Sequence, residues 1–308
     1  MTVAILHRQS VRQLQSAYDA GEAKALSYAL LSHFAGLSRT QLYASPDTAL
    51  TDAVTSRIQA GVTALLDYKP LQYITGETLF CGFPITVTEA VLIPRPETEE
   101  LVRWTVSQIA LTPEAGIADC PTTKTNGNTA IVSSYRVREW APRIIDLCTG
   151  SGCIAVTLAG MLPSATVYAC DNSPAALEIA QRNAARNGVD VHCFRYDLLA
   201  PPAFDCKVDC IVCNPPYVRH SEKAQIAPNV LRYEPPEALF VDDSDPLLFY
   251  RAIARFATHY LHAGGKIFME INEALGRETK ALFHSSGFPN VEVRKDINGK
   301  ERMIMVQS

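Results

Sequence analysis

Apolar residues recur at helical spacing through the first quarter of the chain. Two sets repeat every three or four positions: Leu26, Ala29, Leu30 and Phe34, and then Val54, Ile58, Val62 and Leu65. This spacing predicts helices that each bury one face. Ser38 and the Ser45-Pro46-Asp47 stretch, which lie between the two sets, are typical of helix boundaries. We therefore expect residues 1–72 to form a small helical domain.

The pattern becomes extended at Tyr73. Two short apolar runs, 78–80 and 83–87, lie on either side of Cys81-Gly82, which predicts a β-hairpin. We expect residues 73–95 to be a β-hairpin linker. The prolines at its end interrupt the extended chain, and the acidic residues that follow suit the first turn of a helix. Residues 112–141 are rich in Thr, Asn and Ser and predict an exposed, mobile loop.

Short apolar runs alternate with helical patterns from residue 143 to the end of the chain. The predicted strands are 143–147, 166–170, 191–194, 208–213, 266–271, 291–293 and 303–306. The predicted helices are 153–162, 173–186, 246–262 (stopping at Gly264-Gly265) and 274–286. Such alternation predicts a doubly wound, Rossmann-like parallel sheet. Residues 96–308 are therefore expected to form an α/β domain.

Four polar features follow four successive predicted strands. They are the small-residue turn Cys148-Thr149-Gly150-Ser151-Gly152, Asp171, Asp197 and Asn214. Ligands of such sheets bind at the carboxyl ends of the strands, where an acid can accept the hydroxyls of a ribose. The turn has neither a G-x-G-x-x-G pattern nor a Gly-Lys-Ser/Thr sequence, so dinucleotides and nucleoside triphosphates are poorly supported. A nucleoside without phosphates, such as S-adenosylmethionine, fits better.

The fourth feature begins the sequence Asn214-Pro215-Pro216-Tyr217. Two consecutive prolines force a rigid, extended turn and donate no backbone hydrogen bonds. Carbonyl acceptors, one amide side chain and one aromatic ring then remain for a ligand. This set suits a planar group that carries an NH2, such as a carboxamide or the exocyclic amine of a base.

Net charge and cysteine content limit the binding partners and metal sites that the sequence supports. The formal net charge of −4 gives no general attraction to a polyanion, and residues 1–72 contain six basic and five acidic side chains. No membrane span or signal pattern is evident, so we expect a cytoplasmic protein with no membrane partner. We also expect the protein to be a monomer. The nine cysteines do not form a zinc set. Cys210 and Cys213, the single C-x-x-C, fall within one predicted strand.

The chain resembles the bacterial protein-(glutamine-N5) methyltransferases that modify peptide chain release factors. The resemblance covers nearly the whole chain and rests on residues 92–99 (Leu-Ile-Pro-Arg-Pro-Glu-Thr-Glu), 146–152, 214–217, 233–235 and 238–239. Amino methyltransferases that act on DNA adenine or RNA guanine share the Asn-Pro-Pro-Tyr sequence, so methylation of a base amine is the alternative function. The stretch before the cofactor turn favours the glutamine enzymes. A binding adaptor without catalytic activity is disfavoured by the intact Asn-Pro-Pro-Tyr.

The resemblance implies a class I methyltransferase domain that uses S-adenosylmethionine and modulates translation termination by methylating release factors, with no direct nucleic-acid substrate. Carried over to this sequence, it implies that Cys148 to Gly152 line the methionine part of the cofactor and that Asp171 holds the ribose hydroxyls. Asp197 and Leu198 would lie against the adenine. Asn214 to Tyr217 would hold the substrate glutamine as the catalytic residues, with Asn214 also next to the cofactor.

Two features depart from the family. Residue 148 is usually Gly, and because Cys carries a side chain we expect no positive φ there. Residues 112–141 also exceed the usual spacer in length.

Overall fold

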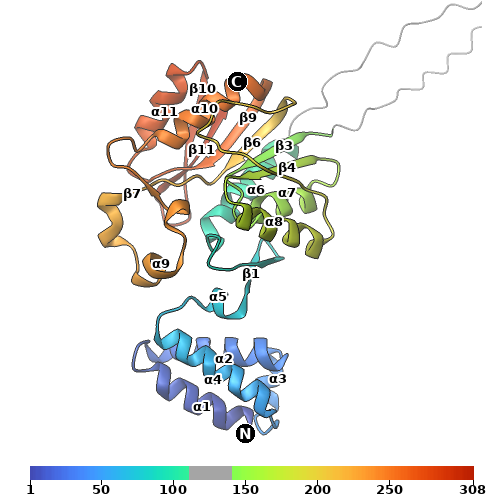
Figure 1. Ribbon diagram of the computed structural model, residues 1–308, viewed down its shortest axis with the longest axis vertical. Helices are drawn as coiled ribbons and strands as arrows, with labels where there is room; N and C mark the ends of the chain where they lie inside the picture. Colours follow the sequence, from blue (N-terminus) through green and yellow to red (C-terminus); the bar gives the residue numbers. More distant parts are fainter. Residues whose placement is uncertain (111–140) are drawn as a thin grey trace, which may run out of the picture. The chain divides into compact units, whose positions relative to one another are not determined.

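A computed structural model describes residues 1–110 and 141–308, which form two compact units (Figure 1). The first unit contains Met1–Pro94 together with Val218–Pro246, and the second contains Arg95–Tyr217 together with Leu247–Ser308. The loop predicted at 112–141 lies outside the described residues except for its last position. No helix of the described ranges is both long and apolar enough to cross a bilayer.

The N-terminal part of the first unit is helical, as predicted. Its helices are α1 (Val3–Leu14), α2 (Ala20–Ala35), α3 (Arg39–Ala44), α4 (Asp52–Leu66) and α5 (Leu71–Thr75). Side chains from three of them, Leu6, Leu30 and Ile58, are almost completely buried in one hydrophobic core. Ser38 caps the N-terminus of α3 through a capping box. Its hydroxyl accepts the Gln41 N–H, and the Gln41 side chain accepts the Ser38 N–H.

The predicted hairpin is present as β1 (Glu77–Phe80) and β2 (Phe83–Thr86), which pair antiparallel. Cys81 and Gly82 both have positive φ, as a two-residue hairpin turn of type I′ requires.

Residues 218–246 belong to the first unit, although the division expected from the sequence assigned them to the α/β domain. Their elements are β7 (Val218–Arg219), η1 (His220–Gln225), α9 (Pro228–Tyr233), η2 (Pro236–Ala238) and β8 (Phe240–Val241). Arg232 and the Tyr233 hydroxyl both bond to the Asp67 carboxylate, at 2.6–2.8 Å. The buried Glu234 accepts the Ile93 N–H at 3.3 Å. These contacts tie the segment to chain more than a hundred residues earlier.

The second unit is built on one seven-stranded sheet of order β10-β11-β9-β6-β3-β4-β5. Its strands are β3 (Arg143–Leu147), β4 (Thr166–Asp171), β5 (His192–Arg195), β6 (Val208–Cys213), β9 (Leu261–Glu270), β10 (Asn290–Lys295) and β11 (Glu301–Gln307). Strands β9, β6, β3, β4 and β5 are parallel to their neighbours in this series. The predicted α/β class with a largely parallel central sheet is confirmed.

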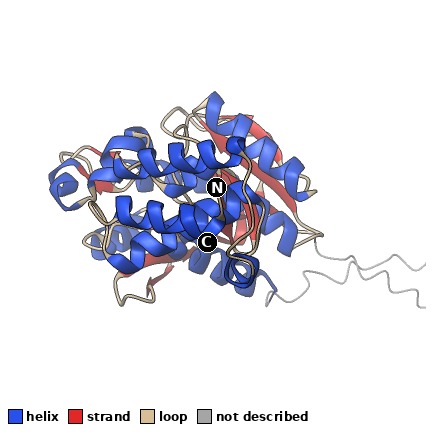
Figure 2. Cartoon of the chain, turned by 90° about the horizontal axis from the view of Figure 1, so that it is seen from below, coloured by secondary structure: helices blue, strands red, loops and turns tan. Residues whose placement is uncertain are grey.

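Helices pack on both faces of this sheet; strands and helices are coloured red and blue in Figure 2. They are α6 (Pro96–Ala110), α7 (Cys153–Met161), α8 (Pro174–Asn187), α10 (Leu248–Tyr260) and α11 (Gly276–Ser285). Consecutive residues of β9 show the two faces. Ile267 packs in the core cluster that contains Phe256 of α10. The Phe268 ring instead makes a T-shaped contact with Trp104 of α6, with ring centres 5.4 Å apart. Successive side chains of a strand point to opposite faces, so α6 and α10 cover opposite sides.

Two details of the predicted sheet are corrected. The strands that close the chain are antiparallel: β11 pairs antiparallel with both β9 and β10. For β10 and β11, the short connection permits a hairpin but no crossover. The helix predicted to stop at Gly264-Gly265 ends at Tyr260, and β9 already begins at Leu261. Gly264 has φ +77° where the β6–β9 register shifts, so the glycines form an irregularity within the strand.

Candidate active site

The carboxyl ends of four neighbouring parallel strands form one edge of the sheet. In this edge Leu147 of β3 pairs with Cys170 of β4 and with Cys213 of β6, and Cys213 pairs with Met269 of β9. The residues that directly follow these paired positions on each strand are therefore neighbours. They are the 148–152 turn, Asp171, Asn214 and Glu270, of which the first three are sequence-predicted site residues.

The 148–152 turn is held to β3 and β4 by its backbone and by Thr149. The Thr149 N–H bonds to the Cys170 carbonyl at 2.9 Å, and its hydroxyl donates to Asp146 at 2.5 Å. Cys148 has φ +58°, so the expectation of a negative φ at this residue was wrong. Its side chain packs against the core cluster of the sheet, and this tertiary contact holds a conformation that its residue type disfavours.

Asp146 is completely buried beneath the turn. Its Oδ2 accepts the Thr149 hydroxyl and the Ala155 N–H, whereas Oδ1 has no hydrogen-bond partner among the described residues. Burial raises the pKa of this carboxyl to about 7, and the two hydrogen bonds only partly oppose that shift. A buried carboxylate with an unpaired oxygen is costly unless it is neutralised by a proton or by a nearby positive charge.

Asp171 ends β4 with its carboxylate oriented by two backbone groups. The Gly150 N–H donates to Oδ2 and the Ser173 N–H to Oδ1, each at 2.9 Å. A carboxylate has about four lone-pair sites, so two remain for ligand hydroxyls. Ser173, rather than Asp171, caps α8 through its side chain.

Asp197 and Leu198 follow β5 and differ in their surroundings. Asp197 is exposed and accepts the Leu199 N–H at 2.9 Å. Leu198 is 6% exposed and belongs to the core cluster of the sheet. The structure thus places Asp197 at the surface and Leu198 mainly in the core, and their contact with adenine stays a prediction.

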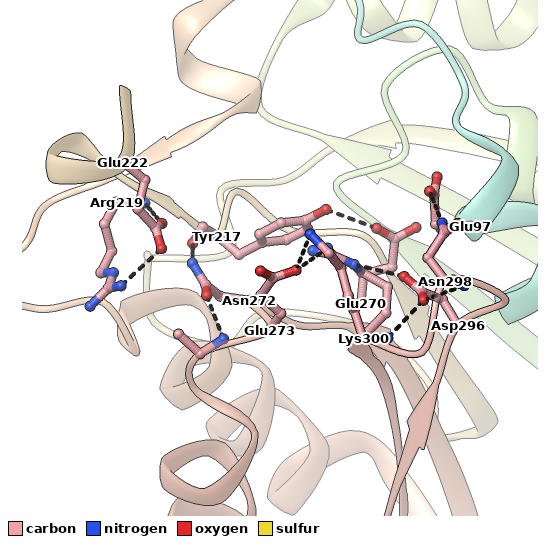
Figure 3. A network of polar contacts seen from close by, with 12 residues as sticks. Glu97, Tyr217, Arg219, Glu222, Glu270, Asn272, Glu273, Asp296, Asn298 and Lys300 are labelled. Atoms are coloured by element: carbon pink, nitrogen blue, oxygen red, sulfur yellow. Dashed lines mark hydrogen bonds and ion pairs between the residues drawn. The ribbon is translucent and has the colours of Figure 1, made fainter. Parts of the chain in front are cut away.

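The Asn214–Tyr217 turn begins immediately after β6 and is tied to the protein at both ends. Asn214 Nδ2 donates to the Thr98 hydroxyl at 3.2 Å. The Tyr217 hydroxyl donates to Glu270 Oε2 at 3.1 Å, and its carbonyl accepts the Asn272 side-chain N–H at 3.0 Å. Figure 3 shows the Tyr217 side chain pointing toward Glu270. Pro215 and Pro216 between these anchors are buried.

Thr98 and Glu270 contact the predicted site residues Asn214 and Tyr217, but the sequence did not predict either of them as part of the site. Thr98 lies in the first turn of α6 and is 2% exposed, and Glu270 ends β9 and is 1% exposed. The Thr98 hydroxyl donates to Glu270 Oε1. Burial raises the pKa of Glu270 to about 7 against the opposing effect of both hydroxyl donors. Thr98 does fall within the 92–99 stretch that the family resemblance singled out, but Glu270 carried no sequence signal beyond its place at a strand end.

Arg302 of β11 lies next to the Tyr217 ring. Its guanidinium carbon is 5.7 Å from the centre of the Tyr217 ring, and its nitrogens reach Glu273 at 3.0 Å and Asp296 at 3.6 Å. A cation over a tyrosine face is an attractive contact, so Arg302 helps to hold the ring in place. Asp296, Glu273 and Lys300 continue this polar network in Figure 3.

The cysteines of the described ranges are free thiols. Cys210 and Cys213 are both buried in β6, and burial raises the pKa of each thiol. An odd separation along a strand places them on opposite faces, so this C-x-x-C does not form a paired dithiol site.

Comparisons with known proteins agree with this architecture. Residues 6–76 match the family model of the PrmC N-terminal domain, and residues 126–239 match that of the Methyltransferase small domain. In the solved structures, the hMettl16 catalytic domain in complex with MAT2A 3′UTR hairpin 1 has a TM-score of 0.53 and 15% identity, covering 91% of this chain and 90% of that one. A likeness at this identity indicates a shared fold alone.

Curated relatives are much more similar. The release factor glutamine methyltransferase of Flavobacterium psychrophilum is 41% identical over 306 residues, which is 99% of each chain. That of Bacteroides thetaiotaomicron is 36% identical over 96% of each chain. Identity at this level over the full length shows that the chain belongs to the release factor glutamine methyltransferase family.

Proposed function

We propose that this protein transfers a methyl group from S-adenosylmethionine to the side-chain amide nitrogen of a glutamine in peptide chain release factors and thereby modulates translation termination. The observation that carries the proposal is the turn Asn214–Tyr217, whose amide and backbone acceptors lie at the sheet edge beside the 148–152 turn and Asp171. Family membership supports the choice of substrate.

The residues present fit S-adenosylmethionine. Gly150 has open space where a Cβ would lie, so a ligand can approach the turn closely. Asp171 keeps acceptor capacity for ribose hydroxyls, and the unpaired oxygen of buried Asp146 favours a positive charge nearby. The residues that would hold the cofactor are Cys148 to Gly152, Asp171, Asp197, Leu198 and Asn214. S-adenosylmethionine supplies an electrophilic methyl group on a sulfonium.

The chain's own residues have to orient a weak nucleophile, because the nitrogen lone pair of a carboxamide is delocalised into its carbonyl. The Asn214 side-chain oxygen accepts one N–H of the substrate amide and the Pro215 carbonyl accepts the other. Both bonds strengthen as positive charge develops on the nitrogen, so they stabilise the transition state more than the ground state. Tyr217 packs against the planar amide. The remaining requirement is alignment for in-line attack.

The charge of the chain does not favour a nucleic-acid substrate. The net charge is −4, and nucleic-acid binding usually depends on clustered positive charge. Methylation of an adenine or guanine amine is therefore the alternative that an experiment has to separate from the proposal.

The test is to incubate the purified protein with methyl-labelled S-adenosylmethionine and, separately, a release factor, DNA or RNA. We expect label in the release factor alone, and its loss when Asn214 is replaced by Ala without loss of folding. Label in nucleic acid but not in the release factor would contradict the proposed substrate. Near-normal transfer by folded Asn214→Ala would contradict the role of Asn214.

A further inference from the structure

The hydroxyl of Thr98 links two elements of the candidate site. Pro96 begins α6 and Thr98 is its third residue, with its N–H bonded to the Arg95 carbonyl at 3.1 Å. This first turn places the Thr98 side chain, which is 2% exposed, between Asn214 and Glu270. A buried hydroxyl with a donor on one side and an acceptor on the other makes both bonds in a defined direction.

The direction of these bonds determines which way the Asn214 amide faces. A threonine hydroxyl has one hydrogen, and here it is donated to the Glu270 carboxyl. The Thr98 oxygen then accepts, and it accepts the Nδ2 hydrogen of Asn214 at 3.2 Å. Because an amide carries nitrogen on one side and oxygen on the other, fixing Nδ2 at Thr98 turns Oδ1 away from it. Oδ1 is the acceptor that an NH2-bearing substrate requires.

Glu270 also holds the other end of the turn. Its Oε2 accepts the Tyr217 hydroxyl at 3.1 Å, so one carboxyl is bonded directly to Tyr217 and, through Thr98, to Asn214. The two prolines between these residues make the turn stiff. Anchoring both ends of a stiff turn fixes the position of every acceptor between them.

We propose that Thr98 and Glu270 are positioning residues for methyl transfer: they set the Asn214 amide with its oxygen toward the substrate and fix the turn that ends at Tyr217. The inference rests on the proposed function for the identity of the substrate amide. Neither residue needs to touch the substrate, because both act through Asn214 and Tyr217.

The protonation state of Glu270 gives this arrangement a pH dependence. Titratable and charged groups facing Glu270 are Glu97 of α6, Cys153 of α7, Tyr217 after β6, Tyr250 of α10 and Arg302 of β11. Only the ionised carboxyl has both oxygens free of protons for the Thr98 and Tyr217 hydroxyls, and burial raises its pKa to about 7. The rate of methyl transfer should therefore rise with pH through about 7.

Thr98→Val and Thr98→Ser test the role of the hydroxyl. Valine keeps the shape of the side chain but removes the hydroxyl, whereas serine keeps the hydroxyl and removes the methyl group. Thr105→Val is the matched control, because Thr105 is fully buried two turns further along α6 and its hydroxyl donates only to the Leu101 carbonyl within the helix. Steady-state kinetics with a release factor would give kcat and KM for each variant, and thermal unfolding would show that each is folded.

We expect Thr98→Val to lower kcat by about 100-fold, the size of effect that follows from misplacing a reacting group, with KM changed much less. Thr98→Ser should recover most of kcat and Thr105→Val should retain it. Glu270→Gln should lower kcat and remove its rise with pH near 7. Full kcat in folded Thr98→Val, no recovery in Thr98→Ser, or an equal loss in Thr105→Val would each overturn the inference.

A second measurement separates this inference from the proposed function. In protein labelled with ¹⁵N-asparagine, the side-chain NH2 signal of Asn214 can be identified by its absence in Asn214→Ser. We expect this signal to shift and to exchange faster with solvent in Thr98→Val than in the parent, Thr98→Ser or Thr105→Val. No difference would overturn the inference. If the Asn214 signal changes only in Thr98→Val but the parent protein methylates no release factor, the inference stands and the proposed function is refuted.

Discussion

Gly150 and Gly152 allow the effects of backbone conformation and of packing to be separated within one turn. Both have positive φ, +54° and +77° respectively. A Cβ added at Gly150 meets nothing within 4 Å, whereas one at Gly152 would lie 2.8 Å from Ala180 Cβ and 2.9 Å from Ala180 Cα. Ala180 is buried in the middle of α8, so relief of this overlap requires the helix to move.

The two alanine substitutions therefore have different costs. Either one places an L-residue in the left-handed region, at about 1–2 kcal/mol. Gly152→Ala adds an overlap with a packed helix, at about 1–3 kcal/mol. We expect the free energy of unfolding of Gly152→Ala to be lower than that of Gly150→Ala by roughly 1–3 kcal/mol, which is the overlap cost alone.

Urea unfolding followed by circular dichroism measures this difference, and calorimetric titration with S-adenosylmethionine measures the second effect. A methyl group at Gly150 enters the open space beside the turn, so Gly150→Ala should weaken cofactor binding by about 10-fold or more, equivalent to about 1.4 kcal/mol. Equal losses of stability in the two variants would refute the packing argument. Parent-like binding by Gly150→Ala would refute the placement of the cofactor at this turn.

Two further predictions concern buried or strained residues. Asp146 and Glu270 have folded-state pKa values of about 7, above their ordinary values, so the folded protein binds protons that the unfolded chain does not. The free energy of unfolding should therefore fall as pH rises from about 5 to 7, by up to about 1.4 kcal/mol per pH unit for each carboxyl. Asp146→Asn and Glu270→Gln should each flatten this slope in urea titrations, and an unchanged slope in both would contradict the burial argument. Cys148 has φ +58°, a conformation that Gly adopts readily and β-branched residues adopt rarely. Cys148→Val should therefore be less stable than Cys148→Gly by about 1–2 kcal/mol. Equal urea unfolding midpoints of the two variants would contradict this prediction.

Much of the fold follows from local sequence pattern. The helices of residues 1–72, the hairpin and the alternation from residue 143 were predictable, because amphipathic spacing and turn residues act within a few positions. The direction of the last strands was harder to predict from the sequence, because the apolar pattern of a strand does not show which neighbour it pairs with. The short connection between β10 and β11 was a usable signal, because parallel neighbours need a long crossover.

Some residues of the candidate site were likewise predictable from local sequence, whereas others depend on tertiary packing. Asn214 stands out because the apolar strand predicted at 208–213 is followed by an amide and two prolines. Asp171 stands out because an acid directly follows the strand predicted at 166–170. Thr98 and Glu270 look ordinary in their local sequence, as a first-turn helix residue and a strand end. Their meeting across 172 positions depends on how α6 packs against β9. Cys148 shows the reverse case, in which tertiary packing overrides a sound local preference.

The central claim is that Asn214 holds a glutamine amide for methylation, and peptide mass spectrometry tests it most directly. A release factor treated with the parent protein and S-adenosylmethionine should gain one methyl group, and fragmentation should place it on the side-chain nitrogen of a glutamine. The same release factor treated with folded Asn214→Ala should gain almost none. A methyl group on any other residue type, or equal methylation by Asn214→Ala, would contradict the account.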